Sequence, residues 1–123
     1  MPENYDQEFL ESVISEHFSY VAKYRNSVVG YVLVGKIDDN YYLISLAVLE
    51  QYRRNGIAKH LIALALKHFK NRKLFLHVRK QNEATISMYQ KFGFKVDSTL
   101  DNYYDDPADD AYLMCAGSLR ALE

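Results

Sequence analysis

The octet Gln51-Tyr52-Arg53-Arg54-Asn55-Gly56-Ile57-Ala58 joins two segments with different patterns, and the fold of the chain can be worked out from this junction. Residues Tyr41 to Leu49, before the octet, are rich in aromatic and branched side chains, which is typical of a buried strand. Residues Ile57 to Phe69, after it, carry apolar side chains at helical spacing. The octet is therefore predicted to be a strand-to-helix turn.

A turn of this kind favours a bound anion, because the first amides of a helix lack acceptors within it and the helix dipole adds positive potential. Gly56 and Ala58 have little or no side chain, so a diphosphate can approach the backbone. Arg53 and Arg54 add charges that can fork onto phosphate oxygens. The alternative is a basic surface turn that only starts a helix, since a short glycine motif is a weak signal.

Length and composition narrow the class of protein. With 123 residues, 49% of them hydrophobic, residues 1–123 are expected to form one domain with a substantial core. The net charge of −1 argues against a general nucleic-acid binder. The only cysteine, Cys115, lies in an apolar run, so no internal disulfide is expected. No apolar run reaches the ~18 residues of a membrane span, and the N-terminus lacks a signal pattern, so we expect a soluble cytoplasmic protein.

The first half of the chain shows one helical and three strand patterns. Asp6 to Glu16 places its apolar residues on one helical face, with Asp6 as a candidate N-cap, and predicts a short amphipathic helix. Three strands, expected to form an antiparallel meander with the last one central, are Phe18 to Tyr24, Val28 to Ile37 and Tyr41 to Leu49. The sequence therefore predicts a mixed α/β domain around a central sheet.

The second half continues this alternation. After a helix from Ile57 to Lys70, Lys73 to Arg79 is predicted to be a strand parallel to the one before the helix, in a right-handed crossover. Asn82 is expected to cap a further helix, and Gly93 to end it in a left-handed conformation. Phe94 to Leu100 and Ala111 to Ala116 are predicted closing strands, joined by the loop Asp101 to Asp110, which contains Tyr103 and Tyr104.

Two motifs now carry a family resemblance. Arg53-Arg54-Asn55-Gly56-Ile57-Ala58 resembles the acetyl-CoA pyrophosphate loop of the GNAT (Gcn5-related) N-acetyltransferases, (Arg/Gln)-x-x-Gly-x-(Gly/Ala). The run from Asn82 through Tyr89 to Gly93-Phe94 resembles their second motif, with Thr85 in place of the usual alanine. Both motifs stand in the right order and at the right separation, so the resemblance, which covers essentially the whole chain, implies the GNAT fold and acetyl-CoA as cosubstrate.

Within the family, the chain most resembles the protein N-terminal (Nα) acetyltransferases of the archaeal and ribosomal-protein alanine acetyltransferase type. Three stretches carry this resemblance: Pro2-Glu3-Asn4-Tyr5, Leu76-His77-Val78-Arg79 and Asn102-Tyr103-Tyr104. They resemble the peptide-site loop, the fifth strand and the lid over the bound N-terminus. The resemblance therefore implies that Glu3, Tyr5, Tyr103 and Tyr104 contact the acceptor.

The expected chemistry needs a base, an oxyanion donor and an acid. An α-amino group has a pKa near 7.7–8.0, so a modest base is enough. His77 fits this role, with Tyr42 positioning a relay water, and Glu3 is an alternative base. The resemblance assigns Tyr89 as proton donor to the departing thiolate. Ordinary structural roles stay open for all four residues.

The resemblance also implies a set of residues that contact the cosubstrate. A backbone N–H among Leu46, Ala47 and Val48 would stabilise the oxyanion. Asn82 would hold the pantetheine arm, although helix capping explains this residue equally well. The expected cofactor-binding residues are thus Leu46, Ala47, Val48, Arg53, Arg54, Asn55, Gly56, Ile57, Ala58, Asn82 and Tyr89. No metal is expected.

The sequence therefore predicts an Nα-acetyltransferase that works by direct transfer in a ternary complex. A small-amine acetyltransferase and a non-catalytic acetyl-CoA-binding subunit are the alternatives. The expected partners are protein or peptide N-termini, with the ribosome as a further candidate, and neither nucleic acid nor membrane.

Family members usually begin with a strand and a helix before the loop that Pro2-Glu3-Asn4-Tyr5 resembles. If this chain lacks both elements, Phe18 to Tyr24 leaves an open sheet edge, which is prone to recruit another chain. We therefore expect either a homodimer that covers this edge, or a Met1 that is an internal methionine of a longer protein.

Overall fold

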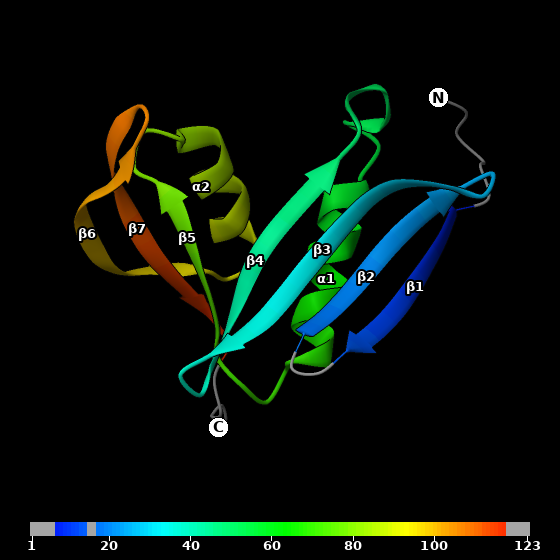
Figure 1. The fold of residues 1–123 in the computed structure, drawn as a ribbon, viewed down its shortest axis with the longest axis horizontal. Coiled ribbons are helices and arrows are strands. Elements are labelled where there is room, and N and C mark those ends of the chain that lie inside the picture. The colour runs from blue at the N-terminus through cyan, green and yellow to red at the C-terminus, as the bar shows by residue number, and fades with distance from the viewer. Residues whose placement is uncertain (1–6, 15–16, 118–123) are drawn as a thin grey trace. The chain divides into compact units, whose positions relative to one another are not determined.

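The computed structural model describes residues 7–14 and 17–117, in two compact units that meet in sequence between His68 and Phe69. The first unit contains β1 (Gln7–Ile14), β2 (His17–Tyr24), β3 (Ser27–Ile37), β4 (Asn40–Val48), the 3₁₀ turn η1 (Glu50–Tyr52) and α1 (Ile57–His68) (Figure 1). Strands β1 to β4 pair with their neighbours in chain order, all antiparallel. The predicted meander is confirmed.

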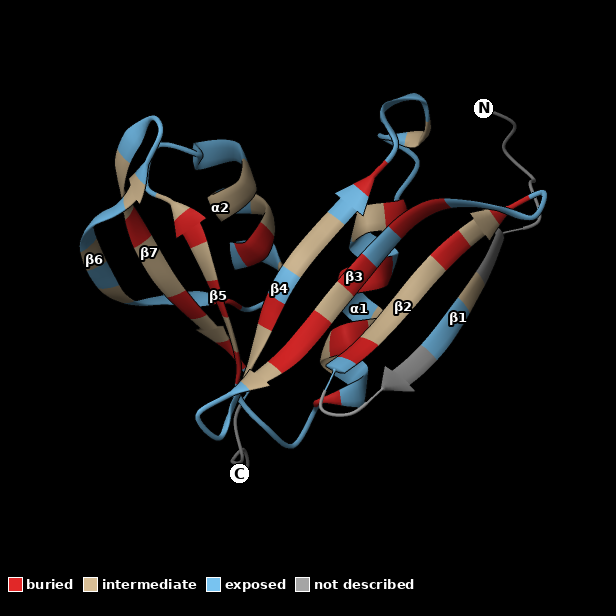
Figure 2. Ribbon diagram, viewed as in Figure 1, coloured by how far each residue is buried: buried red, intermediate tan, exposed pale blue. Residues whose placement is uncertain are grey.

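Helix α1 covers one face of this meander. Its inward residues Leu61, Ile62 and Ala65 are fully buried, as the helical spacing of apolar side chains predicted. Phe18 of β2 stacks on His68 of α1 with ring centroids 3.7 Å apart, which identifies the sheet face that meets the helix. Figure 2 shows the buried positions in red, as bands across β2 and β3, the strands that lie beside α1.

The expected helix from Asp6 to Glu16 is wrong, because its described residues form strand β1. β1 pairs along its length with β2, so the edge of β2 that we expected to be open is covered. Phe9 stacks on His60 of α1 with ring centroids 4.0 Å apart, while Leu10 remains 45% exposed. The spacing of the apolar residues alone favours a helix. The edge of β2, however, offers backbone N–H and C=O groups that a strand can hydrogen-bond and a helix cannot.

The second unit contains β5 (Leu74–Arg79), α2 (Glu83–Lys91), β6 (Lys95–Asp105) and β7 (Ala108–Ala116). β7 lies between β5 and β6 and is antiparallel to both. On β5, buried and half-buried side chains alternate, so Leu74, Leu76 and Val78 point into the core while Phe75, His77 and Arg79 lie on the other face. The predicted strand and helix are confirmed, whereas the parallel crossover between the two units stays a prediction.

The expected loop from Asp101 to Asp110 is also wrong, because β6 continues to Asp105 and β7 begins at Ala108. Between Leu100 and Tyr104 the register shifts, so that β6 holds two more residues than β7 over this stretch. Asn102 there has a φ of 54° and donates its backbone N–H to Asp110 Oδ1 at 2.9 Å. These polar residues thus form a bulge within a long hairpin. The pattern of polar residues in the sequence does not distinguish such a bulge from a loop.

Among the described helices, none combines the length and the apolar character needed to cross a membrane.

Candidate functional site

The turn between β4 and α1 has the backbone that a glycine-dependent anion site needs. Gly56 has a φ of 79° and Arg54 a φ of 66°, so left-handed residues flank Asn55. The Nδ2 group of Asn55 donates to the carbonyls of Tyr52 and Arg53, at 3.2 and 3.0 Å. Asn55 therefore shapes the turn with its own side chain.

Helix α1 presents its free amides at this turn. The first i→i−4 bond of the helix runs from the N–H of His60 to the carbonyl of Gly56, at 2.9 Å. The amides of residues 57 to 59 come before that bond and have no acceptor within the helix. A Cβ built on Gly56 would meet no atom within 4 Å, and no acidic residue lies in the first turn of α1. The turn thus has open space and positive potential where a diphosphate would bind.

The end of β4 decides which backbone groups could contact a thioester. Leu49 donates its backbone N–H to the carbonyl of Val29 on β3 at 2.8 Å. Because backbone groups alternate along an antiparallel ladder, the N–H of Ala47 also points to β3, whereas the N–H groups of Leu46 and Val48 point away from it. Of the three expected oxyanion donors, Ala47 is therefore committed to β3, and Leu46 and Val48 remain candidates.

Arg53 is tied to the same edge of β4. Its Nε donates to the carbonyl of Val48 at 2.9 Å. The Nε–H of this guanidinium therefore holds the turn against the strand, and its remaining N–H groups can donate to an anion. The Arg54 side chain is exposed beside it.

Tyr42 lies on the face of β4 that α1 does not cover. Its neighbour Leu43 pairs with Val34, which in turn pairs with Phe18 on the α1 side of the sheet. Because side chains alternate along a strand, Tyr42 points the other way, opposite Gly35 on β3. It is half-buried there.

The second motif builds both ends of α2. Asn82 Oδ1 accepts the backbone N–H of Thr85 at 3.3 Å, which confirms the predicted N-cap. At the other end Gly93 has a φ of 96°, and its N–H donates to Gln90 while the N–H of Phe94 donates to Tyr89, at 3.0 and 3.1 Å. This pair of bonds is a Schellman motif.

The motif's tyrosine and phenylalanine pack together as part of this helix end. The rings of Tyr89 and Phe94 meet edge to face, with centroids 5.4 Å apart. Tyr89 is 7% exposed, and burial raises the pKa of its hydroxyl. In the described part of the chain no hydrogen bond to this hydroxyl is found. Tyr89 is therefore held as a neutral phenol, as a proton donor must be.

His77 lies under the hairpin of β6 and β7. Its imidazole stacks on Tyr103 with ring centroids 4.8 Å apart and planes 12° apart, and burial lowers its pKa. Tyr103 and Tyr104 meet edge to face at 5.0 Å. The guanidinium of Arg79 lies 4.2 Å from the centroid of the Tyr104 ring. An aromatic cluster that includes the imidazole of His77 thus covers one face of β5.

The predicted site residues fall into three groups. The turn, the end of β4 and Tyr42 lie in the first unit, while α2 and the cluster around His77 lie in the second. Glu3 and Tyr5 lie outside the described residues. Arg79 is part of the motif Leu76-His77-Val78-Arg79 but had no predicted role of its own. Its position two residues after His77 does predict that both side chains lie on the same face of a strand.

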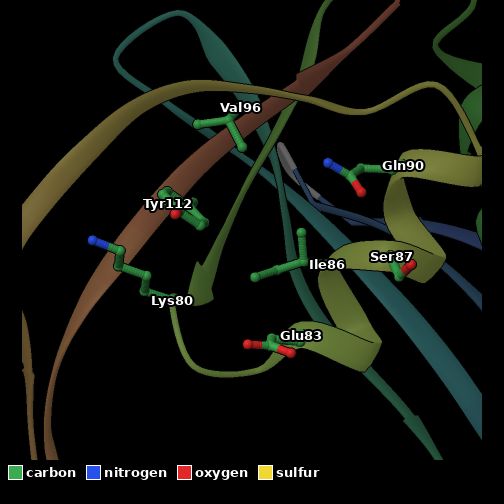
Figure 3. Close-up of a pocket in the computed structure, with 7 residues that line it drawn as sticks. All are labelled: Lys80, Glu83, Ile86, Ser87, Gln90, Val96 and Tyr112. Carbon is green, nitrogen blue, oxygen red and sulfur yellow. The ribbon is translucent and has the colours of Figure 1, made fainter.

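A hollow of about 590 Å³ lies between α2 and the two strands β6 and β7, on the core-side face of the second unit (Figure 3). Its lining residues are Lys80, Glu83, Ile86, Ser87, Gln90, Val96 and Tyr112. None of them belongs to the predicted site. Tyr112 pairs with Val78, whereas His77 points to the opposite face of β5, so the hollow is separate from the aromatic cluster.

Comparison with known proteins gives the family. The model of the acetyltransferase (GNAT) family matches residues 1–94, which include both motifs. The chain is 36% identical to the N-alpha-acetyltransferase of Saccharolobus solfataricus, over 93% of this chain and 78% of that protein. Among solved structures, Ard1 from Thermoplasma volcanium matches with a TM-score of 0.71 and 32% identity, over 83% of this chain and 71% of that one.

A second solved structure supports the fold. A GNAT family acetyltransferase from Elizabethkingia anophelis, solved with acetyl-CoA bound, matches with a TM-score of 0.75 and 22% identity, over 83% of this chain and 76% of that one. The family expected from the two motifs is confirmed. This chain belongs to the acetyltransferase (GNAT) family.

Proposed function

We propose that this chain transfers the acetyl group of acetyl-CoA to the free α-amino group of a protein N-terminus. The observation that carries the acceptor class is the aromatic cluster in which Tyr103 covers His77, because a flat, half-buried surface with a neutral base suits an extended peptide end. The 36% identical relative, which is named an N-alpha-acetyltransferase, supports the same acceptor.

Acetyl-CoA would bind with its diphosphate at the Arg53 to Ala58 turn. The free amides at the start of α1 and the remaining N–H groups of Arg53 would hold the phosphate oxygens, and Arg54 would add charge from the surface. Asn55 acts within the turn, since its amide donates to Tyr52 and Arg53. Asn82 would contact the pantetheine arm in addition to capping α2.

The reaction would be a direct attack. The lone pair of the α-amino nitrogen forms a bond to the thioester carbonyl carbon, the carbon–sulfur bond breaks, and the sulfur leaves as a thiolate. A backbone N–H of Leu46 or Val48 would stabilise the oxyanion that forms between these steps. Tyr89 would donate its proton to the thiolate; its phenol is protonated at neutral pH, and burial raises its pKa further.

The amine must lose one proton during the attack. His77, whose pKa is lowered by burial, is largely neutral at pH 7 and would accept this proton through a water that Tyr42 positions. Glu3 is the alternative base, and Tyr5, Tyr103 and Tyr104 would contact the first residues of the peptide.

Peptides with free N-termini, incubated with acetyl-CoA and read by mass spectrometry with fragmentation, test the proposal. Acetylation of the α-amino group, and none of a matched peptide whose N-terminus is blocked but whose lysines are free, is the expected result. Acetylated polyamines without acetylated peptides would favour a small-amine acetyltransferase. Tight acetyl-CoA binding without any product would favour a non-catalytic subunit.

The proposal includes residues 1–123 acting as one catalytic domain, in the cytoplasm, on N-termini that emerge from the ribosome. A homodimer stays a prediction, although the open edge of β2 from which we inferred it is wrong, because β1 covers that edge. Light scattering and ribosome co-sedimentation test these two partners.

A further inference from the structure

The tip of the β6–β7 hairpin folds back over the sheet. β7 lies between β5 and β6, so a side chain of β6 normally has a strand between itself and β5. Tyr103 nevertheless stacks on His77 of β5. The two extra residues of β6 before Tyr104, with Asn102 in a left-handed conformation, let the strand curl across β7. This curl brings Tyr103, which is expected to contact the acceptor, over His77, the expected base.

Two kinds of bond fasten the curled tip to the end of β5. In the turn after β5, the backbone N–H of Lys80 donates to the carbonyl of Asp110 at 2.9 Å, and the backbone N–H of Gln81 donates to Asp109 Oδ2 at 3.3 Å. The other fastener is one side chain. Arg79 Nη1 donates to the carbonyl of Pro107 at 2.7 Å, and the same guanidinium lies 4.2 Å from the Tyr104 ring centroid.

We propose that Arg79 is a positioning residue of the acceptor site, which holds the β6–β7 tip so that Tyr103 lies over His77 with Tyr104 against its edge. Only an arginine can do this with one group, since a planar guanidinium can lie over a ring while its edge donates to a carbonyl. The bond goes to a backbone oxygen at Pro107, so it fixes the path of the hairpin itself. The role in acceptor binding rests on the proposed function.

The first test needs no activity. In Arg79→Met, which keeps the apolar stem and loses the guanidinium, hydrogen exchange of the amides in residues 101–106 should accelerate about threefold to tenfold, the range expected for a partly exposed cation–π contact and hydrogen bond. Exchange in α2 should not change. Arg25→Met is the matched control, because Arg25 also lies over a tyrosine ring, Tyr24, at 5.1 Å, but in the first unit. Unchanged exchange at the tip in Arg79→Met would overturn the proposal.

The second test is kinetic. Arg79→Met should raise the acceptor KM about threefold to tenfold, with kcat within about twofold and the affinity for acetyl-CoA unchanged. Arg79→Lys should lie between wild type and Arg79→Met, because an ammonium keeps the charge but not the planar fork. Full rescue by lysine would show that charge alone matters, and equal acceptor KM values for wild type and Arg79→Met would show that the tip does not position the acceptor; either result overturns the role.

A double-mutant cycle separates the contact from general loosening. Arg79→Met combined with Tyr104→Leu should raise acceptor KM by less than the product of the two single effects, because both variants remove the contact between the guanidinium and the Tyr104 ring. Additive effects would count against it. If the wild type acetylates no peptide, the proposed function fails, and the exchange measurement alone decides whether Arg79 holds the hairpin.

Discussion

The imidazole of His77 and the ring of Tyr103 lie face to face, 4.8 Å between centroids and 12° between planes, although β7 separates their strands. The stack removes water from one side of the imidazole. Because the charged form of histidine depends most on that water, burial lowers the pKa of His77. The hairpin that is expected to hold the peptide therefore also sets the protonation state of the expected base.

The pH dependence follows from this shift. A lowered pKa means that His77 becomes neutral, and able to accept a proton, at a pH below its ordinary value near 6.5. Tyr103→Ala exposes the imidazole, so the midpoint of the His77 ring-proton titration by NMR should rise towards 6.5. The acidic limb of kcat should move to higher pH with it. Tyr31→Ala, an exposed tyrosine of the first unit, is the control and should leave both midpoints in place.

Gly56 tests the anion site with a matched pair of variants. Any side chain at a φ of 79° strains the backbone. Asparagine and aspartate have the same shape, so both variants carry the same strain and differ only in charge. Gly56→Asp should therefore bind acetyl-CoA more weakly than Gly56→Asn by about tenfold or more, which corresponds to about 1.4 kcal/mol of like-charge repulsion. Calorimetry on both folded variants gives the ratio. Equal affinities would mean that no diphosphate lies against this glycine.

Tyr89 tests the proton donor. Tyr89→Phe removes one oxygen from a buried position where, among the described residues, it has no hydrogen-bond partner. The melting temperature should stay the same or rise, because a buried unpaired hydroxyl costs free energy. The kcat should fall about 100-fold, within the usual range for a lost general acid. Wild-type kcat in this variant would leave Tyr89 a purely structural role in the end of α2.

Asn82 separates capping from cosubstrate binding. Asn82→Ala removes the acceptor for the Thr85 N–H and should cost about 1 kcal/mol of unfolding free energy. Asn82→Asp keeps the cap and loses only the amide donor, so its melting temperature should match the wild type. If the amide also contacts the pantetheine arm, Asn82→Asp should bind acetyl-CoA several-fold more weakly in calorimetry. Wild-type affinity in this variant would reduce Asn82 to a cap.

Sequence patterns predicted the elements whose signals are local. The cap at Asn82, the left-handed Gly93 and the spacing in Ile57 to Phe69 depend on contacts a few residues apart, and all are confirmed. The second motif has a physical explanation as well, because Tyr89 and Phe94 are the two contacting positions of a Schellman motif. The family resemblance and this local packing were read from the same residues.

Two wrong predictions of secondary structure both concern segments that pair with the next strand along the chain. The spacing in Asp6 to Glu16 is helical, but the edge of β2 offers a row of backbone partners, and the described residues of this segment form β1. Asp101 to Asp110 reads as a polar loop, but Asp110 satisfies the amide of Asn102 and lets β6 continue past its bulge. In each case the deciding backbone partner lies on the neighbouring strand, so the residue pattern within the segment itself does not show it.

The sequence by itself determined the family, the strand-to-helix turn at Gly56 and the two ends of α2, because each depends on backbone conformations and capping groups within a short stretch. Only the tertiary structure decided that the backbone N–H of Ala47 faces β3, and that Tyr103 lies over His77 with Arg79 holding the tip. These relationships depend on strand register and on a two-residue bulge, and a shift of one residue in register turns every side chain to the opposite face.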